Sequence, residues 1–135
     1  LIPTLKVAEN LTLPLELNGI RGRAARPQVM RLLDRLGLAA RADAFPDQLS
    51  GGEQQRVAIG RALIHEPSLV LAEEPTGNLD AQTGQEILAL LSELFRERRQ
   101  TLILVTHSLA VSRISDRVLT LEQGQLVHSD PDLSW

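Results

Sequence analysis

LSGGEQQR, at residues 49–56, is the most informative stretch of this sequence. Its Ser50 and Glu53 have the spacing of a capping box, in which each side chain accepts a hydrogen bond from the other residue's amide. We therefore predict a helix that starts after Ser50 and runs through Leu63. Because Gly51 and Gly52 have no side chains, the first amides of that helix remain accessible to a phosphate. Ser-x-x-Glu alone indicates only an ordinary capped helix.

Two acids follow a short apolar run downstream of this helix. Pro67 ends the helix, and LVLA at residues 69–72 is typical of a strand that is buried on both faces. Glu73 and Glu74 come next, at the carboxyl end of the strand, which is where α/β sheets bind ligands. The pair indicates a Mg²⁺ ligand and a base for phosphoryl transfer, although an isolated Glu-Glu is more often two solvated acids.

Apolar spacing predicts the remaining helices. One is expected over residues 9–17, with a bend or restart at Pro14. Another is expected over residues 29–36, with Gly37 as its left-handed cap. Asp80 is suited to cap a third helix, which has a clear apolar stripe.

The final third of the chain completes the expected fold. LILV at residues 102–105 predicts a second buried strand, residues 109–114 a short helix, and Gln123-Gly124 the turn of a hairpin. Strands that alternate with helices indicate an α/β fold with a parallel sheet, and the all-helical start indicates a separate lobe. We therefore expect a helical subdomain at 1–66, an α/β core at 67–128 and a loose tail at 129–135.

The composition excludes several classes of function. A formal charge of -3 with interspersed signs provides no basic face for nucleic acid. Cysteine is absent, so the chain has neither disulfides nor thiolate metal sites. No apolar run approaches the roughly 18 residues of a membrane span. The opening Leu1-Ile2-Pro3-Thr4 lacks an initiating Met, and we expect a piece of a longer chain.

Residues 49–63 and 69–80 together resemble the ATP-binding subunits of ABC transporters, and the resemblance extends to about Val127. It implies part of a P-loop NTPase domain of the ABC type. Residues 2–17 are similar to the branch that serves lipoprotein release and macrolide export. The implied function is ATP hydrolysis that drives transport across the inner membrane, with ATP and Mg²⁺ as ligands.

The resemblance also implies roles for individual residues. Glu74 polarises the attacking water, and His107 contacts the γ-phosphate as the switch histidine. Where the family has an Asp in the magnesium shell, this chain has Glu73, whose extra methylene displaces the carboxylate and leads us to expect slower turnover. The signature residues that close over a partner's nucleotide are Leu49, Ser50, Gly51, Gly52, Glu53 and Gln54. The D-loop residues at the dimer interface are Gly77, Asn78, Leu79 and Asp80.

Two of these roles have simpler alternatives. A plain helix cap explains Asp80 equally well, and a satisfied loop residue is the alternative for His107. The implied partners are a second ATPase subunit, in a head-to-tail dimer, and a transmembrane permease subunit. The permease would hold this chain at the cytoplasmic side of the inner membrane.

Gly-x-x-x-x-Gly-Lys-Ser/Thr, the loop that holds nucleotide phosphates, occurs nowhere in the 135 residues. We expect the chain alone to bind ATP weakly and to hydrolyse none. We also expect it to have exposed apolar sheet faces and an open strand edge.

The alternative function is that of a non-catalytic degenerate or split module that acts through the dimer interface. ABC ATPases of DNA repair or translation fit less well, because their long arms or second cassette are missing.

Overall fold

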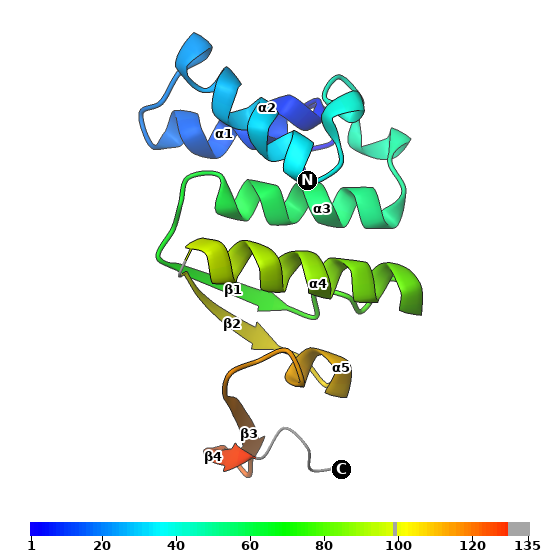
Figure 1. Cartoon of the computed structure of the whole chain (residues 1–135), viewed down its shortest axis with the longest axis vertical. Helices are drawn as coiled ribbons and strands as arrows, with labels where there is room; N and C mark the ends of the chain where they lie inside the picture. Colours follow the sequence, from blue (N-terminus) through cyan, green and yellow to red (C-terminus); the bar gives the residue numbers. More distant parts are fainter. Residues whose placement is uncertain (99, 130–135) are drawn as a thin grey trace.

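The computed structural model describes residues 1–98 and 100–129, and Figure 1 shows them as a stack of layers. The helices are α1 (Val7–Leu17), α2 (Arg26–Arg35), α3 (Gly51–Leu63), α4 (Ala81–Arg98) and α5 (Leu109–Ser112). The strands are β1 (Leu69–Glu73), β2 (Thr101–Val105), β3 (Val118–Glu122) and β4 (Gln125–Ser129). Three 3₁₀ turns, η1 (Gly22–Ala24), η2 (Ala39–Arg41) and η3 (Pro46–Gln48), lie in the connections between the first three helices. In the stack, α1 and α2 lie on one side of α3, and α4 separates α3 from the strands.

Helix α1 continues through Pro14, so the helix does not restart there as one of the two predicted outcomes required. Leu11 and Leu15, on either side of this proline, are both fully buried. Burying two leucines contributes about 3–6 kcal/mol, which offsets the cost of about 3 kcal/mol for a proline inside a helix. Tertiary packing therefore decides the length of α1.

Helices α2 and α3 complete a helical core with α1. The predicted apolar stripe of α2 is buried at Leu32 and Leu33, and Gly37 follows with a φ of +68°, as predicted for a left-handed cap. In α3, Gly60 permits close approach of the helices, because a Cβ there would lie 2.6 Å from Cδ1 of Leu36. The helical part is thus close-packed at its centre.

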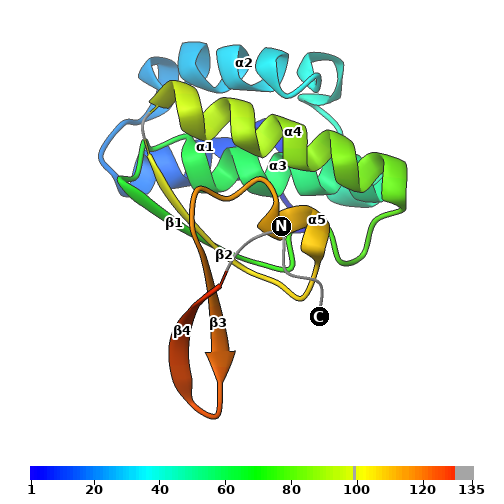
Figure 2. The same cartoon turned by 60° about the horizontal axis from the view of Figure 1, so that its bottom comes forward.

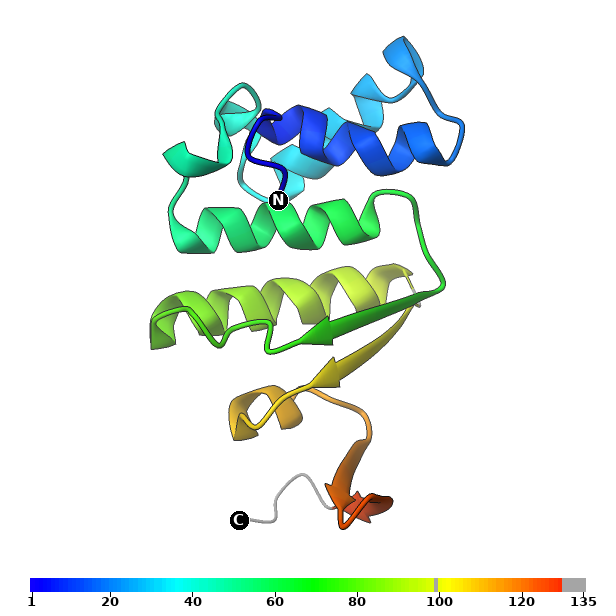
Figure 3. The same ribbon diagram turned by 180° about the vertical axis from the view of Figure 1, so that it is seen from behind.

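Strands β1 and β2 form the predicted parallel pair. Leu69 lies opposite Thr101 and Glu73 lies opposite Val105, so the two strands end at the same edge of the sheet. Figure 3 shows the two arrows side by side beneath α4, pointing in the same direction. The residues that directly follow the two strands are therefore brought together at this edge of the sheet.

Within residues 1–98 and 100–129, one face of this sheet is covered and the other is not. Val70, Leu102 and Leu104 pack against the core beneath α4, whereas Leu71 is 71% and Val105 is 60% exposed. The prediction that both strands are buried on both faces is wrong for the described residues. In Figure 2 the helices α3 and α4 lie to one side of the two strands. The continuous apolar pattern of the strands requires a second cover that these residues do not supply.

Strands β3 and β4 form the predicted hairpin. Gln123 and Gly124 both have positive φ, of 48° and 81°, as a two-residue hairpin turn requires. Ser129 still belongs to β4, so the predicted loose tail begins too early, and its other residues, 130–135, lie outside the described part of the chain. The predicted α/β fold with a helical lobe, parallel strands and a hairpin is confirmed. Within residues 1–98 and 100–129, no helix is both long and apolar enough to cross a membrane.

Candidate active site

The start of α3 has the predicted capping box. The Ser50 hydroxyl accepts from the Glu53 amide at 3.2 Å, and the Ser50 amide donates to Oε2 of Glu53 at 2.8 Å. The other oxygen of Glu53 accepts a hydrogen bond from Nε of Arg41 at 3.0 Å. The bond from the Ser50 amide, reinforced by Arg41, lowers the pKa of Glu53 although desolvation opposes it. Both oxygens of Glu53 therefore hold the helix start in place.

The two glycines of the signature lie in different environments. Gly51 is exposed, and a Cβ there would make an ordinary contact of 3.5 Å with Leu79. Gly52 is buried, and a Cβ there would lie only 2.5 Å from Cγ2 of Thr83. Gly52 thus permits α3 to approach the start of α4, a packing reason that the sequence did not reveal.

A cleft of about 330 Å³ lies between the start of α3 and the D-loop. Its α3 side consists of Ser50, Gly51, Gly52 and Arg56, and its other side of Asn78, Leu79, Asp80, Thr83 and Glu86. Among the described residues, Nε of Arg56 is buried without a hydrogen-bond partner. The cleft therefore combines an open helix start and the cationic Arg56 with the carboxylates of Asp80 and Glu86 on its other side.

Asp80 caps α4, as predicted. Its Oδ1 accepts from the Thr83 amide at 3.0 Å, and its Oδ2 accepts from the Thr83 hydroxyl at 2.6 Å. The bonds from the hydroxyl and the amide of Thr83 lower the pKa of Asp80 against the opposing effect of desolvation. The same two hydrogen bonds fix the side chain of Thr83, which lies against Gly52.

Glu74 and His107 meet at the carboxyl edge of the parallel strands. Oε1 of Glu74 lies 2.9 Å from the His107 amide and 2.8 Å from Nδ1 of the same residue. Oε2 accepts a hydrogen bond from the Thr106 hydroxyl at 3.1 Å. The Glu74 backbone has a φ of 43°, a conformation that is uncommon for a residue with a side chain and that turns the chain sharply out of β1.

The surroundings of Glu74 favour its ionised form. Desolvation raises the pKa of the carboxyl, but the hydrogen bonds from the His107 amide and the Thr106 hydroxyl, with the charge of His107, outweigh it and lower the pKa. The Glu74 side chain is 34% exposed and that of His107 is 89% exposed. Since Nδ1 of His107 faces the carboxylate, the other ring nitrogen remains able to contact a ligand.

The predicted site residues fall into two groups. Ser50 to Gly52 of the signature and Asn78 to Asp80 of the D-loop line the cleft, whereas Glu74 and His107 do not. The other predicted residues of these two segments do not line it either: Leu49, Glu53, Gln54 and Gly77. Hydrogen bonds connect the two places. Nε2 of Gln55 in α3 donates to the Pro75 carbonyl at 2.8 Å, and the amide of the D-loop residue Gly77 donates to the Glu74 carbonyl at 3.1 Å. Individual roles for Gln55, Thr106 and Arg41 were not predicted from the sequence. Thr106 could have been found from its place directly before His107, but no pattern pointed to Arg41.

Glu73 is the predicted magnesium residue. It is exposed at the last position of β1, on the same side of the strand as Leu71. The described residues contain no group of three or more acidic or histidine side chains that could hold a metal by themselves. A lone carboxylate still suits Mg²⁺ that arrives on a nucleotide, because that ion takes few protein ligands and keeps several waters.

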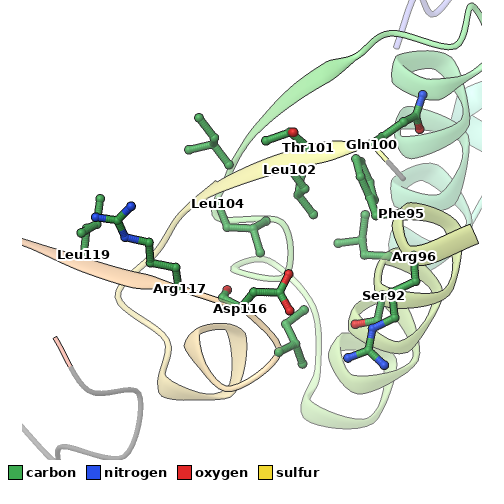
Figure 4. A pocket seen from close by; sticks show the side chains of 14 residues that line it. Ser92, Phe95, Arg96, Gln100, Thr101, Leu102, Leu104, Asp116, Arg117 and Leu119 are labelled. Carbon is green, nitrogen blue, oxygen red and sulfur yellow. The ribbon is translucent and has the colours of Figure 1, made fainter. Parts of the chain in front are cut away.

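A larger hollow, of about 690 Å³, lies away from these residues. Figure 4 shows Phe95 and Arg96 of α4 on one side of it, Leu104 on β2, and Asp116 and Arg117 farther from α4. None of the predicted site residues lines this hollow. It is therefore no part of the candidate site.

Comparison with known proteins agrees with the resemblance noted in the sequence. The sequence profile described as ABC transporter matches residues 1–77. An uncharacterized ABC transporter ATP-binding protein of Mycobacterium tuberculosis is 54% identical over 127 residues, which are 94% of this chain and 51% of that protein. The lipoprotein-releasing system ATP-binding protein LolD of Hyphomonas neptunium is 44% identical over 127 residues, which are 94% of this chain and 56% of that protein.

A solved structure has the same fold. The dimeric, post-hydrolysis ATP-binding cassette MJ0796, bound to ADP and Pi, matches with a TM-score of 0.79 and 40% identity, over 93% of this chain and 56% of that one. The chain thus spans about half the length of the proteins it matches. Because the profile covers more than half of the chain and the relatives match nearly all of it, this chain belongs to the ABC transporter ATP-binding family.

Proposed function

We propose that this chain carries the nucleotide-closing and water-activating residues of an ABC transporter subunit that hydrolyses ATP to drive transport across the inner membrane. The observation that carries the proposal is the carboxylate of Glu74, which is held by Thr106 and His107 at the carboxyl edge of two parallel strands. Ligands of α/β sheets bind at this edge.

Glu74 is placed to orient and deprotonate the attacking water. A carboxylate has about four positions at which it can accept hydrogen bonds, and here Oε1 uses two and Oε2 uses one. One position on Oε2 remains for water. The ionised form that the surroundings favour is the form that accepts the water's proton. His107 would direct its second ring nitrogen at the γ-phosphate.

The separation of the two groups supports action as a dimer. The cleft at Ser50 and the carboxylate of Glu74 lie at different places in one chain, so two chains placed head to tail would bring the signature of one to the Glu74 of the other. The signature residues are then Leu49 to Gln54, and Gly77 to Asp80 lie at the interface. The MJ0796 cassette is described as dimeric and bound to ADP and Pi, which supports this arrangement here.

Magnesium supplies charge neutralisation on the nucleotide phosphates when it is bound. We propose that Glu73 holds it through water. Because Mg²⁺ demands near-ideal octahedral geometry, the extra methylene of Glu73 relative to Asp should slow turnover. The test is the ATPase rate of a Glu73→Asp variant of the fusion protein described below, and a variant that is no faster than the fusion with Glu73 contradicts this proposal.

The membrane connection is also part of the proposal. A permease subunit would anchor the protein at the cytoplasmic face of the inner membrane. Relatives named as lipoprotein-releasing ATP-binding proteins support a transport role. We further propose that residues 1–66 act as the helical subdomain that faces the permease and that 67–128 act as the α/β core.

The test asks whether an added amino-terminal segment that contains a Gly-x-x-x-x-Gly-Lys-Ser/Thr loop, which the 135 residues lack, produces hydrolysis. Escherichia coli YbbA is 52% identical over 126 residues, which are 55% of that protein. We would fuse the part of YbbA that precedes its match to Leu1 and measure Mg²⁺-dependent ATP hydrolysis. The fusion should hydrolyse ATP, and the unfused chain should not.

A Glu74→Gln substitution in the fusion serves as the matched control. It preserves shape but removes the base, so hydrolysis should fall by about two to four orders of magnitude while ATP binding persists. Hydrolysis by the unfused chain, or equal rates with and without Glu74→Gln, would contradict the proposed function.

A further inference from the structure

Thr106 lies between the two candidate hydrolytic residues, and its hydroxyl makes two hydrogen bonds. Oγ1 accepts from the Ser108 amide at 3.0 Å and donates to Oε2 of Glu74 at 3.1 Å. A hydroxyl has a single proton. Because the amide of Ser108 can only donate, that proton is directed to Glu74. The Ser108 amide, at the start of α5, therefore makes the Thr106 hydroxyl the donor in its hydrogen bond with Glu74.

The position of Glu74 needs such a contact. Its backbone lies in the left-handed region, at a φ of 43°, immediately after β1 ends. Both bonds from His107 go to the same oxygen, Oε1. Oε2 is held by Thr106 through a partly buried hydrogen bond. Without Thr106 the carboxylate would be fixed at one oxygen only, and Oε2 could rotate.

We propose that Thr106 is a positioning residue, whose hydroxyl fixes Oε2 of Glu74 so that the remaining lone pair of this oxygen faces the attacking water. The inference rests on the proposed function of Glu74 as base. It assigns to Thr106 no contact with the nucleotide. Thr106 acts through Glu74, so its loss should reduce turnover and leave nucleotide binding unchanged.

Two substitutions separate the hydroxyl from the shape of the side chain. Thr106→Val removes the hydroxyl and keeps the branched shape, whereas Thr106→Ser keeps the hydroxyl and loses a methyl group. In the 135-residue chain, NMR three-bond couplings should show one Glu74 side-chain rotamer in the wild type and in Thr106→Ser. In Thr106→Val they should be averaged over several rotamers, while the backbone spectrum away from residues 74 and 106–108 is preserved.

The active fusion provides the second measurement. In Thr106→Val, kcat should fall about ten- to a hundredfold, since small displacements of a reacting group cost this much, and KM for ATP should stay within about twofold. Thr106→Ser should recover most of kcat. If Thr106→Val disturbs folding, Thr106→Ala replaces it in both measurements.

Each outcome decides a different claim. Wild-type couplings and kcat in Thr106→Val overturn the positioning role, and so does a Thr106→Ser variant that is as slow as Thr106→Val. A fusion that hydrolyses no ATP even with Thr106 overturns the proposed function itself. The couplings measured in the unfused chain then still decide whether Thr106 holds Glu74.

Discussion

The helical part of the molecule and its parallel strands contain similar apolar residues but bury them very differently. Leu11 and Leu33 of the helical part are completely buried, whereas Leu71 and Val105 of the strands are mostly exposed. Three helices can enclose a core among themselves. A two-stranded sheet has two faces, and α4 covers only one of them.

The two groups of site residues follow the same division. The start of α3 and the D-loop are held by close backbone packing at Gly52 and by the caps of two helices. The carboxylate of Glu74 is held at the sheet edge by hydrogen bonds from Thr106 and His107, and its backbone bonds to Val105 and Gly77. We infer that the signature cleft is built into the packed part, and that the sheet edge is the part more easily rearranged.

Truncation of one leucine in each part gives the largest expected difference. Leu33→Ala should lower the free energy of unfolding by about 2–5 kcal/mol, because Leu33 is fully buried and a cavity remains. Leu71→Ala should change it by less than about 0.5 kcal/mol, because Leu71 is 71% exposed. Urea unfolding of both variants measures this. Equal losses would show that the exposed face of β1 is covered in solution.

Gly52→Ala tests the contact between α3 and α4, and the next largest effect is expected there. The new Cβ would meet Cγ2 of Thr83, so unfolding free energy should fall by about 1–3 kcal/mol. Thr83→Ser removes that methyl group but keeps the hydroxyl bonded to Asp80. The double variant should therefore regain most of the loss in urea unfolding. No recovery would show that Gly52 is needed for another reason.

Two N-cap serines, one in each part, give a smaller contrast. Ser50→Ala should cost about 1 kcal/mol, since its hydroxyl accepts from the Glu53 amide. Ser108, the N-cap of α5, makes no side-chain cap bond, so Ser108→Ala should cost much less. Thermal unfolding of both variants checks the difference. A larger loss for Ser108→Ala would contradict this account.

The smallest expected effect is a pH dependence at Asp80, which joins the D-loop to α4. Its pKa is lowered from 3.8, so its stabilising contribution is present above the unfolded value and is lost as pH falls through the folded one. Asp80→Asn keeps a good N-cap but cannot titrate. Between about pH 5 and pH 2 the wild type should lose slightly more stability than Asp80→Asn. The free energy of unfolding is measured with urea at each pH. If it falls equally with pH in the wild type and in Asp80→Asn, then Asp80 does not contribute to the loss of stability in acid.

The places where prediction failed share a physical cause. The capping box at Ser50, the cap at Asp80 and the turn at Gln123 depend on residues a few positions apart, and the structure confirms them. Pro14 was expected to interrupt a helix, and β1 was expected to be buried on both faces. Both outcomes depend on what packs against the element, which local spacing does not contain.

Local chemistry in the sequence determined the helix starts and the parallel α/β order, because short-range hydrogen bonds and strand polarity follow from neighbouring residues. Only the tertiary structure decided that Gly52 is a packing residue, that Thr106 shares the carboxylate of Glu74, and that one sheet face is exposed. These depend on segments distant in the chain, whose contacts form only when the whole core is packed.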